Sequence, residues 1–370
     1  MELQVRAGAV IALRLFDVAY AIDLAQVEAL WKAQGTVGVS RGRLAHTPAK
    51  ALAFDVPPVA LSLPGETLEI GGVPRGAAVS ARVYEFGVVA IAIRIPVADH
   101  GWADYARLVA ATDQRIGHAA DAPIWMRILD GLLAVIRPAL QRPGAAMLQE
   151  DYLYALVQQW HEPLSAAEIL ERADLASLLA DETRPLSDET RRDLLRQRYS
   201  YYQDDLVVLT WDRAFVCEPR GDSDVIDVIE VANAQLLEMR YYDELLDDEL
   251  PRMYDWVEET RRSTYFRAPR RFADLARRLY GLVAEVTELT EKVDNALQVT
   301  EDVYLARVYT SALDLLRVPK LSAAVDRKLS IIRDTYTALF DEASASRAEL
   351  LEVTIVLLIV AEIVLALLKI

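Results

Sequence analysis

The sequence predicts an α+β protein in which a mixed α/β N-terminal domain precedes an all-α, coiled-coil-like helical unit. Three observations lead to this prediction. Short apolar runs separated by glycine and proline turns fill the first part of the chain, and apolar residues spaced by three and four fill the second. A nearly uninterrupted apolar stretch then ends the chain as one expected C-terminal transmembrane helix. We therefore expect domains at residues 1–218, 224–349 and 350–368.

The composition excludes several classes of protein. Hydrophobic residues make up 53% and charged residues 26% of the 370 residues, so disorder is excluded as the main state. The formal net charge of -16 opposes global attraction to nucleic acid or anionic lipid. Cys217 is the single cysteine, and the 4 histidines are scattered, so neither a disulfide framework nor a clustered metal site is expected. We expect no cofactor and no small-molecule substrate.

The N-terminal domain alternates strand and helix signals. Apolar runs bounded by turn residues indicate strands, with 79–86 and 88–95 forming one hairpin and 205–210 and 214–218 forming another. Glycine and proline at 71–76 indicate a turn between strands. The other expected strands are residues 10–16, 51–54, 59–63, 68–70 and 152–160, and the expected helices are residues 102–117, 124–140, 165–179 and 187–198.

After a boundary at 219–223, the sequence is helical to its end. One apolar seam runs from Phe272 to Ala296, and a second runs through Val325, Leu329, Ile332, Tyr336, Leu339 and Ala343. Residues 299–316 form another amphipathic helix, which Pro319 is expected to stop. Short helix connections favour an antiparallel hairpin within one chain, while pairing of the seams between chains remains the alternative.

Residues 350–368 contain only three polar residues, Glu352, Thr354 and Glu362. As a helix they would span about 28 Å, close to a hydrocarbon core of about 30 Å. Glu362 would cost about 3 kcal/mol at mid-membrane, and the surrounding Ile, Val and Leu outweigh that cost. The alternative is a fully buried helix of a soluble bundle.

The ends of the chain predict a location in the cytoplasmic membrane. No secretory signal or transit peptide is visible at the start, so we expect a single-pass tail anchor with its N-terminal domain in the cytoplasm. The positive-inside bias supports this orientation through the basic residues ahead of the apolar stretch, which are Arg327, Lys328, Arg333 and Arg347.

Two motifs are candidate functional sites. Ser40 lies in a Gly-x-Ser-x-Gly pattern, but the residues around it make a poor strand–turn–helix, so a hydrolase is not favoured. A belt of arginines follows the acidic segment 242–259, and the belt consists of Arg261, Arg262, Arg267, Arg270, Arg271, Arg277 and Arg278. Mutual neutralisation of the two segments is the plain interpretation. The functional one is contact with phosphates of lipid, RNA or a ribosome, with Tyr265 and Phe266 interleaved.

Several segments resemble the required for meiotic nuclear division protein family, a domain-of-unknown-function family of bacteria, fungi and mitochondria. The segments that carry the resemblance are residues 84–89, 204–216 with Trp211, 232–243 and 347–364. The resemblance implies a membrane-associated oligomer without a known catalytic site, whose mitochondrial members support translation by holding ribosomes near the membrane. It also implies that Glu362, with Leu358, Ile359 and Val364, lies in an oligomeric membrane segment with a shared carboxyl. The missing transit peptide points to a bacterial version.

These inferences predict a non-catalytic, membrane-anchored homo-oligomeric scaffold, which tethers a translation complex or another cytoplasmic complex to the membrane. The alternative is a soluble enzyme or ligand-binding protein that uses the N-terminal α/β domain, and it would depend on Ser40. A third hypothesis is an RNA or ribosome binder that works through the arginine belt.

Overall fold

The computed structural model describes residues 3–35, 39–41, 57–118, 120, 122–144, 148–182, 184–221, 224–261, 274–281, 283–284, 286–287 and 303–368. For residues 39–41, 256, 259–261, 342–351 and 365–368 it describes the backbone alone. The chain divides into two compact units. The first unit contains residues 1–238 and 292–319, and the second contains residues 239–291 and 320–370.

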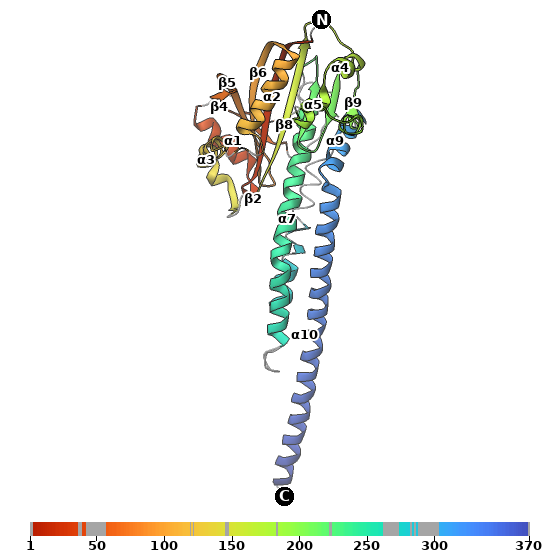
Figure 1. The fold of residues 1–370 in the computed structure, drawn as a ribbon. Helices are drawn as coiled ribbons and strands as arrows, with labels where there is room; N and C mark the ends of the chain where they lie inside the picture. The colour runs from red at the N-terminus through yellow and green to blue at the C-terminus, as the bar shows by residue number, and fades with distance from the viewer. Residues whose placement is uncertain are drawn as a thin grey trace. The chain divides into compact units, whose positions relative to one another are not determined.

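A mainly antiparallel sheet forms the centre of the first unit (Figure 1). Within the described residues, its strand order is β3-β4-β5-β6-β1-β8-β11-β10-β9. Among the described strands, only β8 and β11 pair in parallel. The strands are β1 (Gln4–Asp17), β3 (Val39–Arg41), β4 (Val59–Ile70), β5 (Val73–Val83), β6 (Val88–Gly101), β8 (Gln149–Trp160), β9 (Arg198–Tyr199), β10 (Leu206–Leu209) and β11 (Arg213–Cys217). A separate small sheet pairs β2 (Ala19–Ile22) with β7 (Leu140–Pro143).

The central strand β1 is buried on both faces, because helices cover the sheet from both sides. Val10 and Phe16 belong to one apolar core, whereas Ile11 and Leu15 belong to the other. This burial explains the continuous apolar run of β1. Gly8 lies at a close approach of β1 to β8, since a Cβ atom there would lie 2.3 Å from the carbonyl oxygen of Leu156.

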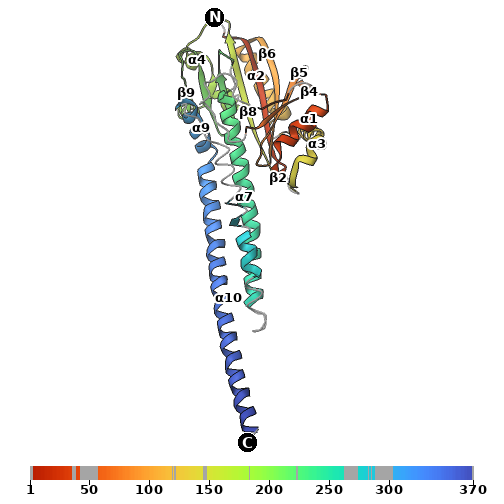
Figure 2. The ribbon, with the colours of Figure 1, turned by 180° about the vertical axis from the view of Figure 1, so that it is seen from behind.

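In the described part of the chain, one core packs five α-helices against the sheet, and the other packs two. The first core includes buried residues of α1 (Leu24–Ala33), α2 (Trp102–Ile116), α3 (Ile124–Ile136), α4 (Ala166–Arg172) and α5 (Leu175–Ala180). The second core includes the beginning of α7 (Asp224–Arg261) and α9 (Val303–Leu315), which can be followed in Figure 2. The short helix α6 (Asp188–Leu194) has no buried residue.

The second unit is helical in its described residues. It contains the later part of α7, helical residues 274–281 and most of α10 (Val318–Leu368). Lys328 Nζ on α10 lies 2.5 Å from Asp243 Oδ1 and 2.7 Å from Asp247 Oδ1 on α7. Tyr336 stacks between Tyr280 and Phe340, with ring centroids 5.8 and 6.1 Å away. The second seam is buried at Val325, Leu329, Ile332 and Leu339.

The α+β class and the C-terminal helical region are confirmed, and several element bounds differ from those expected. Segments 59–63 and 68–70 form one strand, β4, with an irregular register between Leu63 and Glu66. Pro319 does not stop a helix, because it lies in the first turn of α10, where its missing N–H costs no helical hydrogen bond. The strand expected at 51–54 lies outside the described residues.

The transmembrane helix expected at residues 350–368 is a prediction that the structure corrects. In the described part of the chain, no helix combines the length and apolarity that crossing a bilayer requires. The apolar stretch in question includes residues 352–364 of α10. Glu352 and Glu362 lie within this stretch. The single-pass location in the cytoplasmic membrane is corrected with it.

Candidate functional site around Arg213

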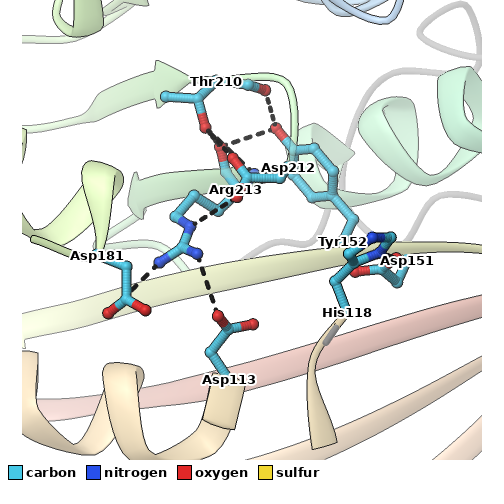
Figure 3. Close-up of polar contacts among 8 residues, drawn as sticks. All are labelled: Asp113, His118, Asp151, Tyr152, Asp181, Thr210, Asp212 and Arg213. Carbon is cyan, nitrogen blue, oxygen red and sulfur yellow. Dashed lines mark hydrogen bonds and ion pairs between the residues drawn. The ribbon is translucent and has the colours of Figure 1, made fainter. Parts of the chain in front are cut away.

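A tight turn between β10 and β11 places Arg213 at the start of β11. Thr210 N donates to the Arg213 carbonyl at 2.9 Å, and Arg213 N donates to Thr210 Oγ1 at 3.2 Å. The hydroxyl of Tyr152 on β8 donates to the carbonyl pair of Thr210 and Arg213, at 2.9 and 3.0 Å. These contacts fix the backbone from which the Arg213 side chain extends (Figure 3).

Three carboxylates surround the largely buried guanidinium of Arg213 (Figure 3). Nη2 lies 3.2 Å from Asp113 Oδ2 on α2, and Nε lies 3.2 Å from Asp212 Oδ2 in the turn. Nη1 lies 4.0 Å from Asp181 Oδ1, at the end of α5, and forms no hydrogen bond in the described structure. Burial raises the pKa of Asp113, although the Arg213 cation opposes this shift.

A histidine–aspartate pair lies beside this cluster, just after α2. His118 Nδ1 is 2.6 Å from Asp151 Oδ1, and the hydrogen bond and charge of Asp151 raise the pKa of this exposed imidazole. Asp151 lies opposite Arg14 in the pairing of β8 with β1. Gly117 allows the chain to pass close to Asp113 of α2, because a Cβ atom at this position would lie 1.9 Å from Asp113 Oδ1.

Arg14 of β1 links the sheet to the end of α2. Its Nη2 atom donates to the carbonyl of Gly117 at 2.7 Å, and its guanidinium carbon lies 5.2 Å from the ring centroid of Trp125. The indole Nε1 of Trp125 donates in turn to the carbonyl of Ile116 at 2.8 Å. Burial lowers the pKa of Arg14. The polar groups around Arg213 and Arg14 therefore join α2, α5, β1, β8 and the β10–β11 turn.

The arrangement around Arg213 explains how the surrounding helices and strands are held in place better than it explains a catalytic role. The hydroxyls of Tyr152 and Thr210 are engaged by main-chain atoms or by Asp212, and the guanidinium contacts are internal. No set of three or more histidine, cysteine or acidic side chains within the described residues is arranged to hold a metal ion. Sequence reasoning missed this cluster, because its members lie far apart in the chain.

A second ionic cluster joins the sheet to α7. Arg82 Nη2 on β5 lies 2.5 Å from Asp227 Oδ1, and Arg82 Nη1 lies 3.4 Å from Glu230 Oε2. The hydroxyl of Tyr84 donates to Glu230 Oε1 at 2.7 Å. Burial raises the pKa of Glu230, and the charge of Arg82 opposes that shift.

The structure does not bring the predicted arginine belt together. Arg262, Arg267, Arg270 and Arg271 lie outside the described residues, and Arg261 is described by its backbone alone, at the end of α7. Arg277 and Arg278 are exposed on helical residues 274–281, and Arg277 pairs with Asp274. The belt as a whole therefore stays a prediction.

The two remaining predicted sites occupy different elements. Ser40 lies within strand β3, opposite Ala60 of β4, and not at a strand-to-helix turn that would expose a nucleophile. Glu362, Leu358, Ile359 and Val364 all lie on α10 with exposed side chains. Their place in a membrane segment is not supported.

Comparisons with known proteins match the chain to a different family from the one that it was expected to resemble. Residues 7–224 match the sequence model of a family described as "Uncharacterized protein MJ0711, N-terminal domain". The uncharacterized protein MJ0711 of Methanocaldococcus jannaschii is 26% identical over 232 residues, which cover 62% of this chain and 70% of that protein. No solved structure matches the chain. The resemblance to the meiotic nuclear division family is therefore wrong, and it no longer supports a role at ribosomes or in mitochondria.

Proposed function

Since the chain belongs to the family of the MJ0711 N-terminal domain, we propose its function from its own structure: a non-catalytic scaffold that assembles with copies of itself through the end of α10. The expected domain of unknown function is consistent with this family's description. The observation that carries the proposal is the exposure of consecutive large apolar side chains near the end of α10.

The apolar side chains surround the helix and do not form a single stripe. Residues 355–360 are six consecutive apolar residues, and successive helical residues point about 100° apart, so together they cover every direction. Their exposed fractions range from 49% at Val360 to 65% at Leu358. A helix that is apolar all round requires neighbours on more than one side.

The amount of exposed surface fits a stable assembly. The exposed large apolar residues described there are Val353, Ile355, Val356, Leu357, Leu358, Ile359, Val360, Ile363 and Val364. Each is about half exposed, so burial would contribute roughly 1 kcal/mol for each side chain and about 10 kcal/mol for each chain. A dissociation constant of about 1 μM corresponds to about 8 kcal/mol, which leaves a margin for the cost of association.

Further copies of this chain are the occupants that we propose. The same helix already packs by its second seam at Val325, Leu329 and Ile332, so an assembled bundle would extend a packing mode that α10 uses within one chain. Several parallel copies would place identical apolar rings against one another. Glu362 would then lie near its counterparts in the other chains, and hydration would relieve their repulsion.

The test is the mass of the purified full chain in solution. Leu357→Glu with Leu358→Glu places two charges in the proposed bundle, so we expect dissociation to the monomer. Val303→Glu with Met126→Glu is the matched control, because it also replaces two exposed apolar residues, on α9 and α3. Analytical ultracentrifugation measures both variants. A wild-type monomer, or equal dissociation by both variants, would contradict the proposal.

A further inference from the structure

Four arginines line one surface hollow in the first unit. The hollow has a volume of about 400 Å³ and lies between α6 and β9. Its lining residues are Arg191, Arg192, Leu195, Arg196 and Arg198. Such a concentration of positive charge stands out in a chain with a formal net charge of -16. We call this hollow the arginine pocket.

Most of this charge is not neutralised within the described structure. Arg191 Nη2 lies 2.8 Å from Asp174 Oδ1 and is the member of the set that has a carboxylate partner among the described residues. Arg192 Nε donates to the carbonyl of Asp188 at 3.1 Å. Arg198 Nη1 donates a long hydrogen bond of 3.5 Å to the carbonyl of Leu195. Both contacts are to main-chain carbonyls, and neither Arg192 nor Arg198 has a carboxylate partner among the described ion pairs.

Four guanidinium groups around one hollow favour a ligand that carries several negative charges. Arginine presents planar pairs of N–H donors that match phosphate oxygens, and each charge-assisted hydrogen bond is stronger than a neutral one. A single carboxylate would use one or two of the four groups, whereas linked phosphates would engage more.

Exposed aromatic side chains follow the pocket in the sequence. Tyr201 and Tyr202 are 61% and 45% exposed, and their ring centroids lie 4.7 Å apart. Tyr202 lies four positions after Arg198, so their Cα atoms lie within about 14 Å of each other. The guanidinium carbon of Arg220 lies 4.2 Å from the centroid of the Tyr202 ring. Arginines beside exposed aromatic rings are typical of surfaces that hold phosphates and stack bases.

We propose that the arginine pocket binds the phosphate groups of a nucleotide or of a single-stranded nucleic acid. The phosphates contact Arg192, Arg196 and Arg198, and Arg191 contributes from its pair with Asp174. The Tyr201–Tyr202 pair offers a stacking surface for a base. This site is separate from the arginine belt predicted at residues 261–278 and does not depend on self-assembly through α10.

Fluorescence anisotropy with the full-length protein tests the pocket directly. The probes are a labelled 12-nucleotide single-stranded RNA and, as competitors, ATP and inorganic tripolyphosphate. Arg196→Ala with Arg198→Ala should weaken binding at least tenfold in 50 mM NaCl. It should also reduce the slope of log affinity against log salt for the RNA by about 1.4, because two phosphate contacts are lost.

Arg6→Ala with Arg137→Ala is the matched control, since it removes the same charge from exposed residues on β1 and beyond α3. We expect its affinity to stay within twofold of the wild type. Arg192→Ala is a second pocket variant and should weaken binding severalfold on its own. The circular dichroism melts of all variants should match the wild type, because the substituted side chains are exposed.

The competitors separate the two sources of phosphate. Displacement of RNA by ATP and tripolyphosphate supports a site for compact phosphate chains, while binding of RNA without displacement supports a nucleic-acid backbone. The proposal is overturned if the wild type binds neither the labelled RNA nor, in a direct titration, a fluorescently labelled ATP in 50 mM NaCl. It is also overturned if the control variant loses as much affinity as the pocket variant. Sedimentation of the pocket variant as the wild-type oligomer would show that assembly is a separate property.

Discussion

Arg82 on β5 and Asp227 on α7 form an ion pair of 2.5 Å that joins the sheet to the helix packed on it. Glu230 accepts from Tyr84 and lies 3.4 Å from the same guanidinium, so one cation serves two buried carboxylates. Such a pair is costly to break, because removal of one partner leaves buried charge uncompensated.

Arg82→Met should therefore lower the free energy of unfolding by about 3 kcal/mol at pH 7. Urea unfolding followed by tryptophan fluorescence measures the loss. Adding Glu230→Gln to Arg82→Met should recover part of it, since one of the stranded carboxylates is then neutral. Arg107→Met is the control, because Arg107 is exposed and pairs with Asp104 on the same helix. Equal losses in Arg82→Met and Arg107→Met would show that the buried pair does not hold α7 in place.

Arg213→Met should destabilise the first unit by about 3 kcal/mol at pH 7. Without the cation, Asp113 and Asp212 repel each other, and the pKa of Asp113, which is already raised, rises further. A carboxyl whose pKa is higher in the folded than in the unfolded state makes the protein less stable as the pH rises. The loss of unfolding free energy in Arg213→Met should therefore be smaller at pH 4 than at pH 7. Urea titrations at the two pH values measure this difference. A deficit that does not change with pH would argue against an electrostatic role for Arg213.

Asp17 at the end of β1 should make the free energy of unfolding depend on pH. Burial raises the pKa of this carboxyl to about 7, well above its unfolded value of 3.8. The folded state therefore binds the proton more tightly, and stability falls as the pH rises from about 4 through about 7. Asp17→Asn should raise the free energy of unfolding by up to about 4 kcal/mol at pH 8 and change it little at pH 4. A gain of the same size at both pH values would contradict this account.

Cys217 should be unreactive in the folded protein. Its thiol is buried under Trp160, whose Nε1 lies 3.4 Å from Sγ, and burial raises the pKa of the thiol to about 12. The thiolate, which is the reactive form, is therefore rare at neutral pH. Ellman's reagent should label Cys217 only as fast as the protein unfolds, and urea should restore full labelling. Rapid labelling in buffer at pH 8 would place the thiol in a different environment.

The sequence was most informative where local patterns decide the structure. The hairpin of β10 and β11 and the pairing of β5 with β6 are confirmed, because apolar runs flank a short polar or glycine-containing turn in each case. Helix α1 was missed, although Asp23 caps its first turn and Leu24, Val27 and Trp31 fall on one buried face. That signal was present in the sequence, in a short segment between strands.

Long-range contacts and solvent exposure could not be predicted in the same way. Arg213 and Asp113 lie 100 residues apart, so nothing in the sequence around either one indicates the other. The four arginines of the arginine pocket lie close together in the sequence, but the sequence analysis did not single them out, because their arrangement around one hollow depends on how α6 and β9 pack. The apolar end of α10 predicted a transmembrane helix, which the structure corrects. Residue type indicates that such side chains avoid water, and it does not identify what covers them.

The mass of the full-length chain in solution tests the central claim of self-assembly most directly. Sedimentation equilibrium over a hundredfold range of concentration should give an oligomer of more than two chains that persists at micromolar concentration. The Leu357→Glu with Leu358→Glu variant should sediment as a monomer of 41.3 kDa. A wild-type chain that sediments as that monomer throughout the range, with the apolar side chains of α10 intact, would contradict the account.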